Sequence, residues 1–154
     1  MQIEIRERPA CRVAYVRRVG PYGEVGAAWQ TLMKWGWTKM IFGKPETFGL
    51  CFDDPEVTPA ERVRYEACMV VDENARVKGD VRARAMAGGR YAVAVHEGPF
   101  ETIGATYAGL CAKVASGVAG MVRLGDPPSL EVYLTDPRKT KPEELRTEVW
   151  MEVE

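Results

Sequence analysis

One carboxylate stands out because it lies inside a short apolar segment. Glu131 is the second residue of the segment 130–134, whose other members are apolar or aromatic. Side chains alternate between the two faces of a β-strand, so Glu131 and Tyr133 would share one face. A carboxylate removed from bulk water requires a polar or charged partner, and a cationic ligand can supply one. Both residues are therefore candidate ligand-binding residues. An ion pair of Glu131 with Arg64 or Arg146, or simple exposure to solvent, is the structural alternative.

An internal repeat provides the comparison that makes Glu131 informative. Gly20-Pro21-Tyr22 recurs 78 residues later as Gly98-Pro99-Phe100, and Asp54-Pro55 recurs 82 residues later as Asp136-Pro137. The change of offset places four additional residues in the second copy, between its helix and the strand that follows. We assign repeat one to about residues 2–72 and repeat two to about residues 79–154. Both belong to a single domain, 1–154.

The repeat is asymmetric at the candidate site. With the offset of 82 residues, Gly49 stands where the second copy has Glu131, and Cys51 stands where it has Tyr133. Replacement of a large acidic residue by glycine predicts an asymmetric cleft with room beside the carboxylate. The cleft residues Gly49 and Cys51 are therefore added to the candidate ligand-binding set.

Aromatic residues supply candidate walls for such a cleft. Trp150 is equivalent to Cys68, and Trp37 follows the apolar stripe of the first predicted helix. Aromatic faces next to one acid suit flat cations through stacking and cation–π contacts. Trp37, Cys68 and Trp150 are candidate ligand contacts, with ordinary packing as the alternative. Trp29 and Tyr107 lie in the middle of helical stripes, which favours core packing.

Other chemistry finds little support in the sequence. The four cysteines form no CxxC pair and there is one histidine, so we expect free thiols and no metal site. No motif for a nucleophilic Ser or Cys and no phosphate-binding glycine loop is present, and Gly88-Gly89 is typical of a hairpin. We expect no cofactor. His96 aligns with Arg18, which indicates a polar strand-end position.

The pattern of elements predicts an α+β fold. Each copy reads as strand, helix, strand and strand, preceded by an early strand near 2–7 or 80–86, and each helix carries one apolar stripe. The repeats should pair about a pseudo-two-fold axis into an antiparallel sheet with the helices on one face and a central ligand groove. The predicted strands are 11–18, 48–52 and 62–71 in repeat one, and 90–97, 130–134 and 145–153 in repeat two.

Composition limits the partners that we expect. The formal net charge is −1, which argues against direct nucleic-acid binding. No segment resembles a signal peptide or a membrane-spanning helix, so we expect a cytoplasmic protein with no membrane partner. The chain enters its first strand at once, so we expect no fused DNA-binding domain.

The ordered motifs resemble one known family. Gly-Pro-Tyr before the helix, Phe48-Gly-Leu-Cys-Phe-Asp-Asp-Pro-Glu56 and Arg64-Tyr-Glu-Ala-Cys68 resemble the first half of GyrI-like domains. Two further stretches, Gly98-Pro-Phe-Glu101 and Glu131-Val-Tyr-Leu-Thr-Asp-Pro137, resemble the second half of those domains. The resemblance covers nearly the whole chain. It implies the fold of the effector-binding domains of multidrug-sensing transcription activators, in which a pocket acid complements cationic aromatic ligands.

The resemblance leaves several functions open. We expect a stand-alone protein that binds small cationic or amphipathic aromatic molecules, as a sensor or by sequestering them. The alternative is a hydrolase of strained-ring electrophilic toxins that uses Glu131 and Tyr133, because an acid beside a tyrosine suffices for such chemistry. A role in modulating DNA gyrase, through a protein partner, is a third hypothesis. A homodimer is a further alternative for the partner.

Overall fold

The computed structural model describes residues 1–117 and 128–153, and these residues form eight β-strands and two α-helices. The predicted α+β class is confirmed. The predicted insertion in the second copy falls on residues 118–127, which lie outside the described part. The chain divides into two compact units, which we call the α1 unit (Pro9–Gly88) and the α2 unit (Met1–Arg8 with Gly89–Glu154).

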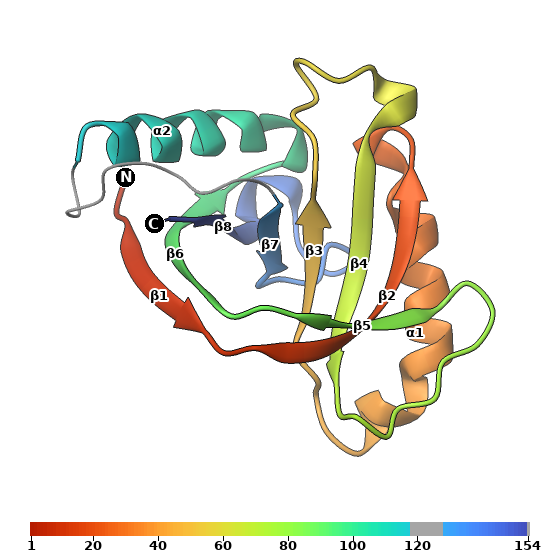
Figure 1. Cartoon of the computed structure of the whole chain (residues 1–154). Helices are drawn as coiled ribbons and strands as arrows, with labels where there is room; N and C mark the ends of the chain where they lie inside the picture. The colour runs from red at the N-terminus through yellow and green to blue at the C-terminus, as the bar shows by residue number, and fades with distance from the viewer. Residues whose placement is uncertain (118–127, 154) are drawn as a thin grey trace. The chain divides into compact units, whose positions relative to one another are not determined.

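The α1 unit is a four-stranded antiparallel sheet in the order β3-β4-β2-β5, with one helix on it (Figure 1). Its core lies between the helix α1 and alternate residues of the central strands, among them Ala14, Ala67 and Met69, with Leu32 from α1 fully buried. The apolar residues that recur about every 3.6 positions in the helix and every second position in the strands both face this core. The elements are β2 (Cys11–Val19), α1 (Gly26–Ile41), β3 (Thr47–Cys51), β4 (Arg64–Val71) and β5 (Arg82–Met86).

The α2 unit has the same plan, with strand order β1-β6-β8-β7 and antiparallel pairing. Its core joins Leu110 and Val114 of α2 to Ala92, Ala94 and Val149 of the sheet. Partly buried Tyr107 and Met151 pack against this cluster. The elements are β1 (Glu4–Arg8), β6 (Gly89–Glu97), α2 (Ile103–Ala115), β7 (Ser129–Tyr133) and β8 (Arg146–Glu152).

The units do not coincide with the repeats of the sequence. β1 falls within repeat one but pairs with β6 of repeat two, and β5 falls within repeat two but pairs with β2 of repeat one. A two-residue hairpin requires residues with positive φ, which Pro9-Ala10 cannot provide, and neither Gly88 nor Gly89 has positive φ. The chain therefore continues from one unit into the other at both points. The hairpin that we predicted at Gly88-Gly89 is wrong.

The Gly-Pro pair after each first strand makes the same turn in both units. Gly20 and Gly98 have φ of 150° and 122°, a region that favours glycine. Their N–H groups donate to Val63 O and Leu145 O, each at 2.8 Å. A short 3₁₀-helix follows, at Tyr22–Glu24 and Phe100–Thr102, and leads into the α-helix. Two further 3₁₀-helices, Ala60–Arg62 and Pro142–Glu144, precede the last strand of each unit.

Helix α1 continues well past the predicted stripe, to Ile41, so Trp35 and Trp37 lie within it rather than in a loop. A single Gly36 does not end the helix, and its missing side chain makes room for Met69, whose Cε would lie 2.9 Å from a Cβ there. The helix ends just before Gly43-Lys44-Pro45. No helix in the described part of the chain has the length and apolar character needed to cross a membrane.

Candidate functional site

Glu131 lies on the helix-covered face of the α2 unit. In the β7–β8 ladder Glu131 is opposite Val149, and Tyr133 is opposite Thr147. Val149 belongs to the core cluster beneath α2, so Glu131 and Tyr133 point toward the same side. The predicted pairing of these two side chains on one face is confirmed by this register.

Two phenol groups hold the Glu131 carboxylate. The Tyr107 hydroxyl donates to Glu131 Oε2 at 2.7 Å, and the Tyr133 hydroxyl donates to Glu131 Oε1 at 3.2 Å. The Tyr107 oxygen also lies 3.2 Å from Ser129 Oγ. An ionised carboxylate is an acceptor at both oxygens, so this arrangement fixes its orientation, and within the described part of the chain these contacts bring no cationic side chain to the carboxylate.

Among the described residues, Glu131 forms no ion pair with Arg64 or Arg146, the two arginines named in the predicted alternative. Arg64 bonds Asp53 at 2.8 Å, and Arg146 lies 3.7 Å from Glu97. Across residues 1–117 and 128–153 the contacts recorded for the Glu131 carboxylate come from hydroxyl groups and not from a cationic side chain. The side chain is half-buried rather than fully exposed. A half-buried acid without a cationic partner is the feature that a positively charged ligand would satisfy.

Aromatic rings extend the site beyond the carboxylate. The rings of Phe100 and Tyr133 meet edge to face, with centroids 5.8 Å apart. Phe100 is 38% exposed. The site thus has three aromatic side chains: Tyr133 on β7, Tyr107 on α2 and Phe100 in the turn before α2. Sequence analysis did not single out Ser129. It favoured core packing for Tyr107, which the structure confirms, but it did not predict the hydrogen bond from Tyr107 to Glu131. The place of Tyr107 on the stripe of α2 that faces β7 is the signal that could have identified this bond.

The α1 unit fills the equivalent position differently. A Cβ at Gly49 would lie 2.2 Å from the Tyr65 hydroxyl oxygen, so the Tyr65 side chain occupies the space next to Gly49. Trp29 Nε1 donates to that hydroxyl at 2.8 Å, as Tyr107 donates to Glu131 in the other unit. The cleft predicted beside the Glu131 carboxylate stays a prediction, but the space at Gly49 itself is filled. The physical reason is a compensating substitution, because Tyr65 stands where the second copy has Thr147.

Trp150 lies on the opposite face of its sheet from Glu131, because it is opposite Leu130 in the ladder. Its indole N–H donates to Glu148 at 3.1 Å, and the guanidinium carbons of Arg6 and Arg8 lie 5.3 and 5.1 Å from its ring centre. Trp150 is only 7% exposed. The structure thus places it with basic side chains rather than with the Glu131 carboxylate.

The remaining predicted site residues lie in the α1 unit. Cys51 and Cys68 are buried free thiols, and burial raises the pKa of the Cys68 thiol far above its ordinary value. Cys68 shares its strand with Glu66, whose fully buried carboxylate pairs with Arg17 and Arg84. Trp37 lies on α1 and is 58% exposed. Trp37, Cys51 and Cys68 belong to the α1 unit and Glu131 to the α2 unit, so their part in a ligand site stays a prediction.

His96 has a structural role in the α2 unit. Its ring nitrogens lie 2.7 Å from Thr106 Oγ1 and 2.9 Å from Pro99 O, and its side chain is buried. These contacts tie the end of β6 to the start of α2. The polar strand-end interpretation of His96 agrees with this geometry. No group of three or more metal-ligating side chains occurs among the residues that the structure describes.

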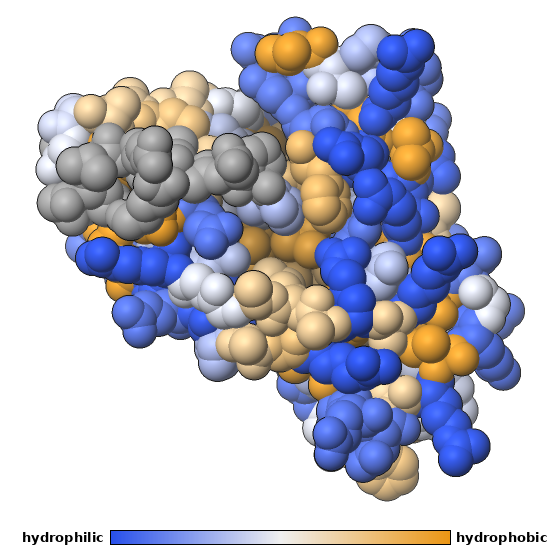
Figure 2. All heavy atoms as spheres, in the orientation of Figure 1, coloured by the Kyte–Doolittle hydropathy of each residue, from blue (hydrophilic) through white to orange (hydrophobic). Residues whose placement is uncertain are grey.

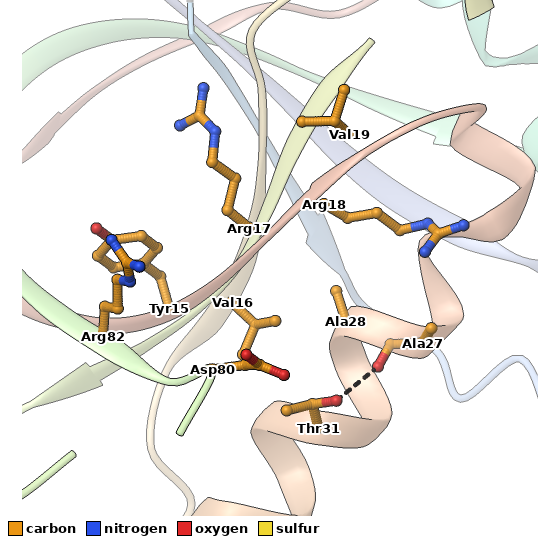
Figure 3. A pocket seen from close by; sticks show the side chains of 10 residues that line it. All are labelled: Tyr15, Val16, Arg17, Arg18, Val19, Ala27, Ala28, Thr31, Asp80 and Arg82. Atoms are coloured by element: carbon orange, nitrogen blue, oxygen red, sulfur yellow. Dashed lines mark hydrogen bonds between the residues drawn. The ribbon is translucent and has the colours of Figure 1, made fainter. Parts of the chain in front are cut away.

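A cavity of about 510 Å³ lies in the α1 unit beside the end of β2 (Figure 3). Its charged lining consists of three arginines, Arg17, Arg18 and Arg82, and one acid, Asp80. Its size suits a small ligand, but a lining with an excess of arginines disfavours a cation. The surface drawn in Figure 2 shows hydrophobic and hydrophilic residues interspersed, as is usual for globular proteins. The Glu131 cluster therefore remains the better candidate for a cationic ligand.

Comparison with known proteins places this geometry in a family. The model of the GyrI-like small molecule binding domain matches residues 1–154. The SPbeta prophage-derived protein YosT of Bacillus subtilis is 35% identical over 95 residues, which are 60% of this chain and 64% of YosT. The chain thus matches less than two thirds of the length of that relative.

Two solved structures share the fold. The EcmrR C-terminal domain superposes with a TM-score of 0.75 at 20% identity, and covers 99% of this chain and 97% of its own. SAV2435, solved with tetraphenylphosphonium bound, gives a TM-score of 0.63 at 16% identity, with 100% and 94% covered. At these identities the likeness concerns the fold. Because the family model matches the whole chain, this protein belongs to the GyrI-like small-molecule-binding domain family.

Proposed function

We propose that the protein binds small cationic aromatic molecules and that Glu131 is the counter-charge for the ligand. The observation that carries this proposal is the half-buried Glu131 carboxylate, held by the hydroxyl groups of Tyr107 and Tyr133 and without a cationic partner among the residues of the described chain. A ligand cation placed there would gain an ionic hydrogen-bonding or Coulomb partner that is partly shielded from water.

The neighbouring rings support an aromatic ligand. Phe100, Tyr107 and Tyr133 offer edges and faces within the same cluster, and flat cations gain from stacking and cation–π contacts. A fold relative has been solved with tetraphenylphosphonium, a cation with four phenyl rings. That ligand belongs to the relative. For this chain it identifies the chemical class with which the proposal is best tested.

Titration with a fluorescent cationic dye such as a rhodamine tests the proposal. Glu131→Gln keeps the shape of the side chain and removes its charge, so we expect a loss of about 1–3 kcal/mol in binding free energy. Glu97→Gln is the matched control, because Glu97 lies in the same unit and its side chain is 71% exposed. Equal affinity of the wild type and Glu131→Gln would remove Glu131 from the ligand site.

The hydrolase alternative uses the same groups. Tyr133 lies 3.2 Å from one carboxylate oxygen of Glu131, so an acid and a hydroxyl could act together on a strained ring. Incubation with an electrophilic strained-ring compound, followed by mass spectrometry, separates the two functions. Turnover that Glu131→Gln abolishes would establish an enzyme. Binding without consumption of the compound supports a binding protein, whether its role is sensing or sequestration.

A further inference from the structure

Four large apolar side chains are exposed together at the end of helix α1. Their exposed fractions are 58% for Trp37, 38% for Met40, 62% for Ile41 and 91% for Phe42. We call these residues the apolar tip. The other large apolar residues exposed in the described chain are spread over different elements, and single exposed residues of that kind are common. A contiguous exposed apolar group is a typical mark of an interaction surface.

Helix geometry explains why the apolar tip forms one surface. Trp37 and Ile41 are four residues apart and Trp37 and Met40 three apart, so they lie on the same side of α1. Phe42 is the residue that ends the helix. The nearby Trp35 points elsewhere, because its indole donates to Arg76 O at 3.1 Å and Lys39 lies over its ring at 5.2 Å. Trp35 is thus held by its own unit.

The apolar tip stands in a basic segment. No Asp or Glu occurs between Glu24 and Glu46, a stretch that contains Lys34, Lys39 and Lys44. The segment therefore carries a charge of +3, although the formal net charge of the chain is −1. Lys34 precedes the apolar tip in the sequence and Lys44 follows it, and both side chains are exposed. In Figure 1 helix α1 leads at its end into the connection to β3.

The charge decides among the possible occupants. A second copy of the chain would bring two segments of charge +3 together, which opposes association. A surface that is negative outside and apolar beneath suits both parts of the segment at once. We propose that the apolar tip inserts into the interfacial layer of an anionic lipid bilayer, with Lys34 and Lys44 on the lipid phosphates. This mode requires no membrane-spanning helix, so the proposal departs from our sequence-based expectation of no membrane partner. It does not depend on the proposed small-molecule site.

Sedimentation with lipid vesicles tests the proposal. The probes are vesicles of phosphatidylcholine alone and of phosphatidylcholine and phosphatidylglycerol in equal parts. We expect binding to the anionic vesicles, with a blue shift of tryptophan fluorescence, and much weaker binding to the neutral ones. A juxtamembrane lysine contributes about a fivefold gain in affinity, so Lys34→Gln with Lys44→Gln should weaken binding by about 25-fold.

Two further variants distinguish insertion from charge attraction alone. Ile41→Ser with Phe42→Ser removes the two most exposed side chains of the apolar tip and should abolish both binding and the blue shift. Val57→Ser is the control, because Val57 is 80% exposed in the same unit beside acidic residues, and it should leave binding unchanged. Absence of binding to anionic vesicles, or equal binding to both kinds of vesicle, would overturn the proposal. Dimerisation that depends on the apolar tip, without vesicle binding, would overturn it as well.

Discussion

A single methyl group added at Gly49 tests how the α1 unit fills the position that Glu131 holds in the α2 unit. The new Cβ of Gly49→Ala would lie 2.2, 2.7 and 2.8 Å from Oη, Cζ and Cε2 of Tyr65. Tyr65 is 2% exposed, accepts a hydrogen bond from Trp29 and meets the Tyr22 ring at 6.2 Å, so it has little space into which to move. The methyl group must therefore displace core side chains.

The expected loss of stability is large for such a small substitution. Overpacking of a well-packed core costs about 1–3 kcal/mol, and loss of the Trp29–Tyr65 hydrogen bond adds about 1 kcal/mol. We expect Gly49→Ala to lower the free energy of unfolding by about 3 kcal/mol and the melting temperature by about 6–12 °C. Urea and thermal unfolding followed by circular dichroism measure both quantities.

Two companion variants make this prediction specific. Gly26→Ala is the control, because a Cβ at Gly26 would meet no atom within 4 Å, and its stability should stay within about 1 kcal/mol of the wild type. Tyr65→Thr introduces the residue that the second copy has at this position. In that background Gly49→Ala should cost less than it does alone, which a double-mutant cycle detects. An unchanged stability of Gly49→Ala would refute the packing argument.

Two further predictions concern titratable groups. Hydrogen bonding to Arg64 lowers the pKa of Asp53 below its ordinary value of 3.8. Ionised Asp53 therefore stabilises the fold at pH values above 3.8, and this stabilisation is lost as the pH falls through the folded-state pKa. Urea midpoints measured from neutral pH to about pH 2 should fall less steeply for Asp53→Asn than for the wild type, and parallel curves would contradict the role of this pair. Burial raises the pKa of the Cys68 thiol, so Cys68 should react with a thiol reagent only after unfolding, whereas the half-buried Cys11 and Cys111 should be labelled first. Peptide mapping of the labelled native protein decides this, and early labelling of Cys68 would count against its burial.

Local periodicity predicted the elements well because each one buries one face. The strands β2 and β6 and the apolar faces of both helices follow directly from alternating or 3.6-residue patterns. The end of α1 was missed because Gly36 interrupts the stripe, whereas the helix continues to Ile41. The partners of β1 and β5 were not predictable from alternation, which indicates that a strand exists but not which strand it joins.

The candidate site was predicted in part for a similar reason. Glu131 is out of place in an apolar segment, and that anomaly, with Tyr133 on the same face of the strand, is visible in the sequence. Tyr107 is not anomalous on an apolar helical stripe, so its hydrogen bond to Glu131 required the structure. Tyr65 on β4 fills the space next to Gly49 on β3. A position-by-position comparison of the two repeats gave no sign of this contact between different strands.

The central claim is that the charge of Glu131 selects cations, and a pair of ions with the same shape tests it most directly. Calorimetry gives the dissociation constants of tetraphenylphosphonium and tetraphenylborate for the wild type and for Glu131→Gln. The intrinsic difference between the two ions cancels when the preference for the cation is compared between the two proteins. We predict that the preference falls by about tenfold or more in Glu131→Gln, which corresponds to about 1.4 kcal/mol. An equal preference in both proteins would contradict the account.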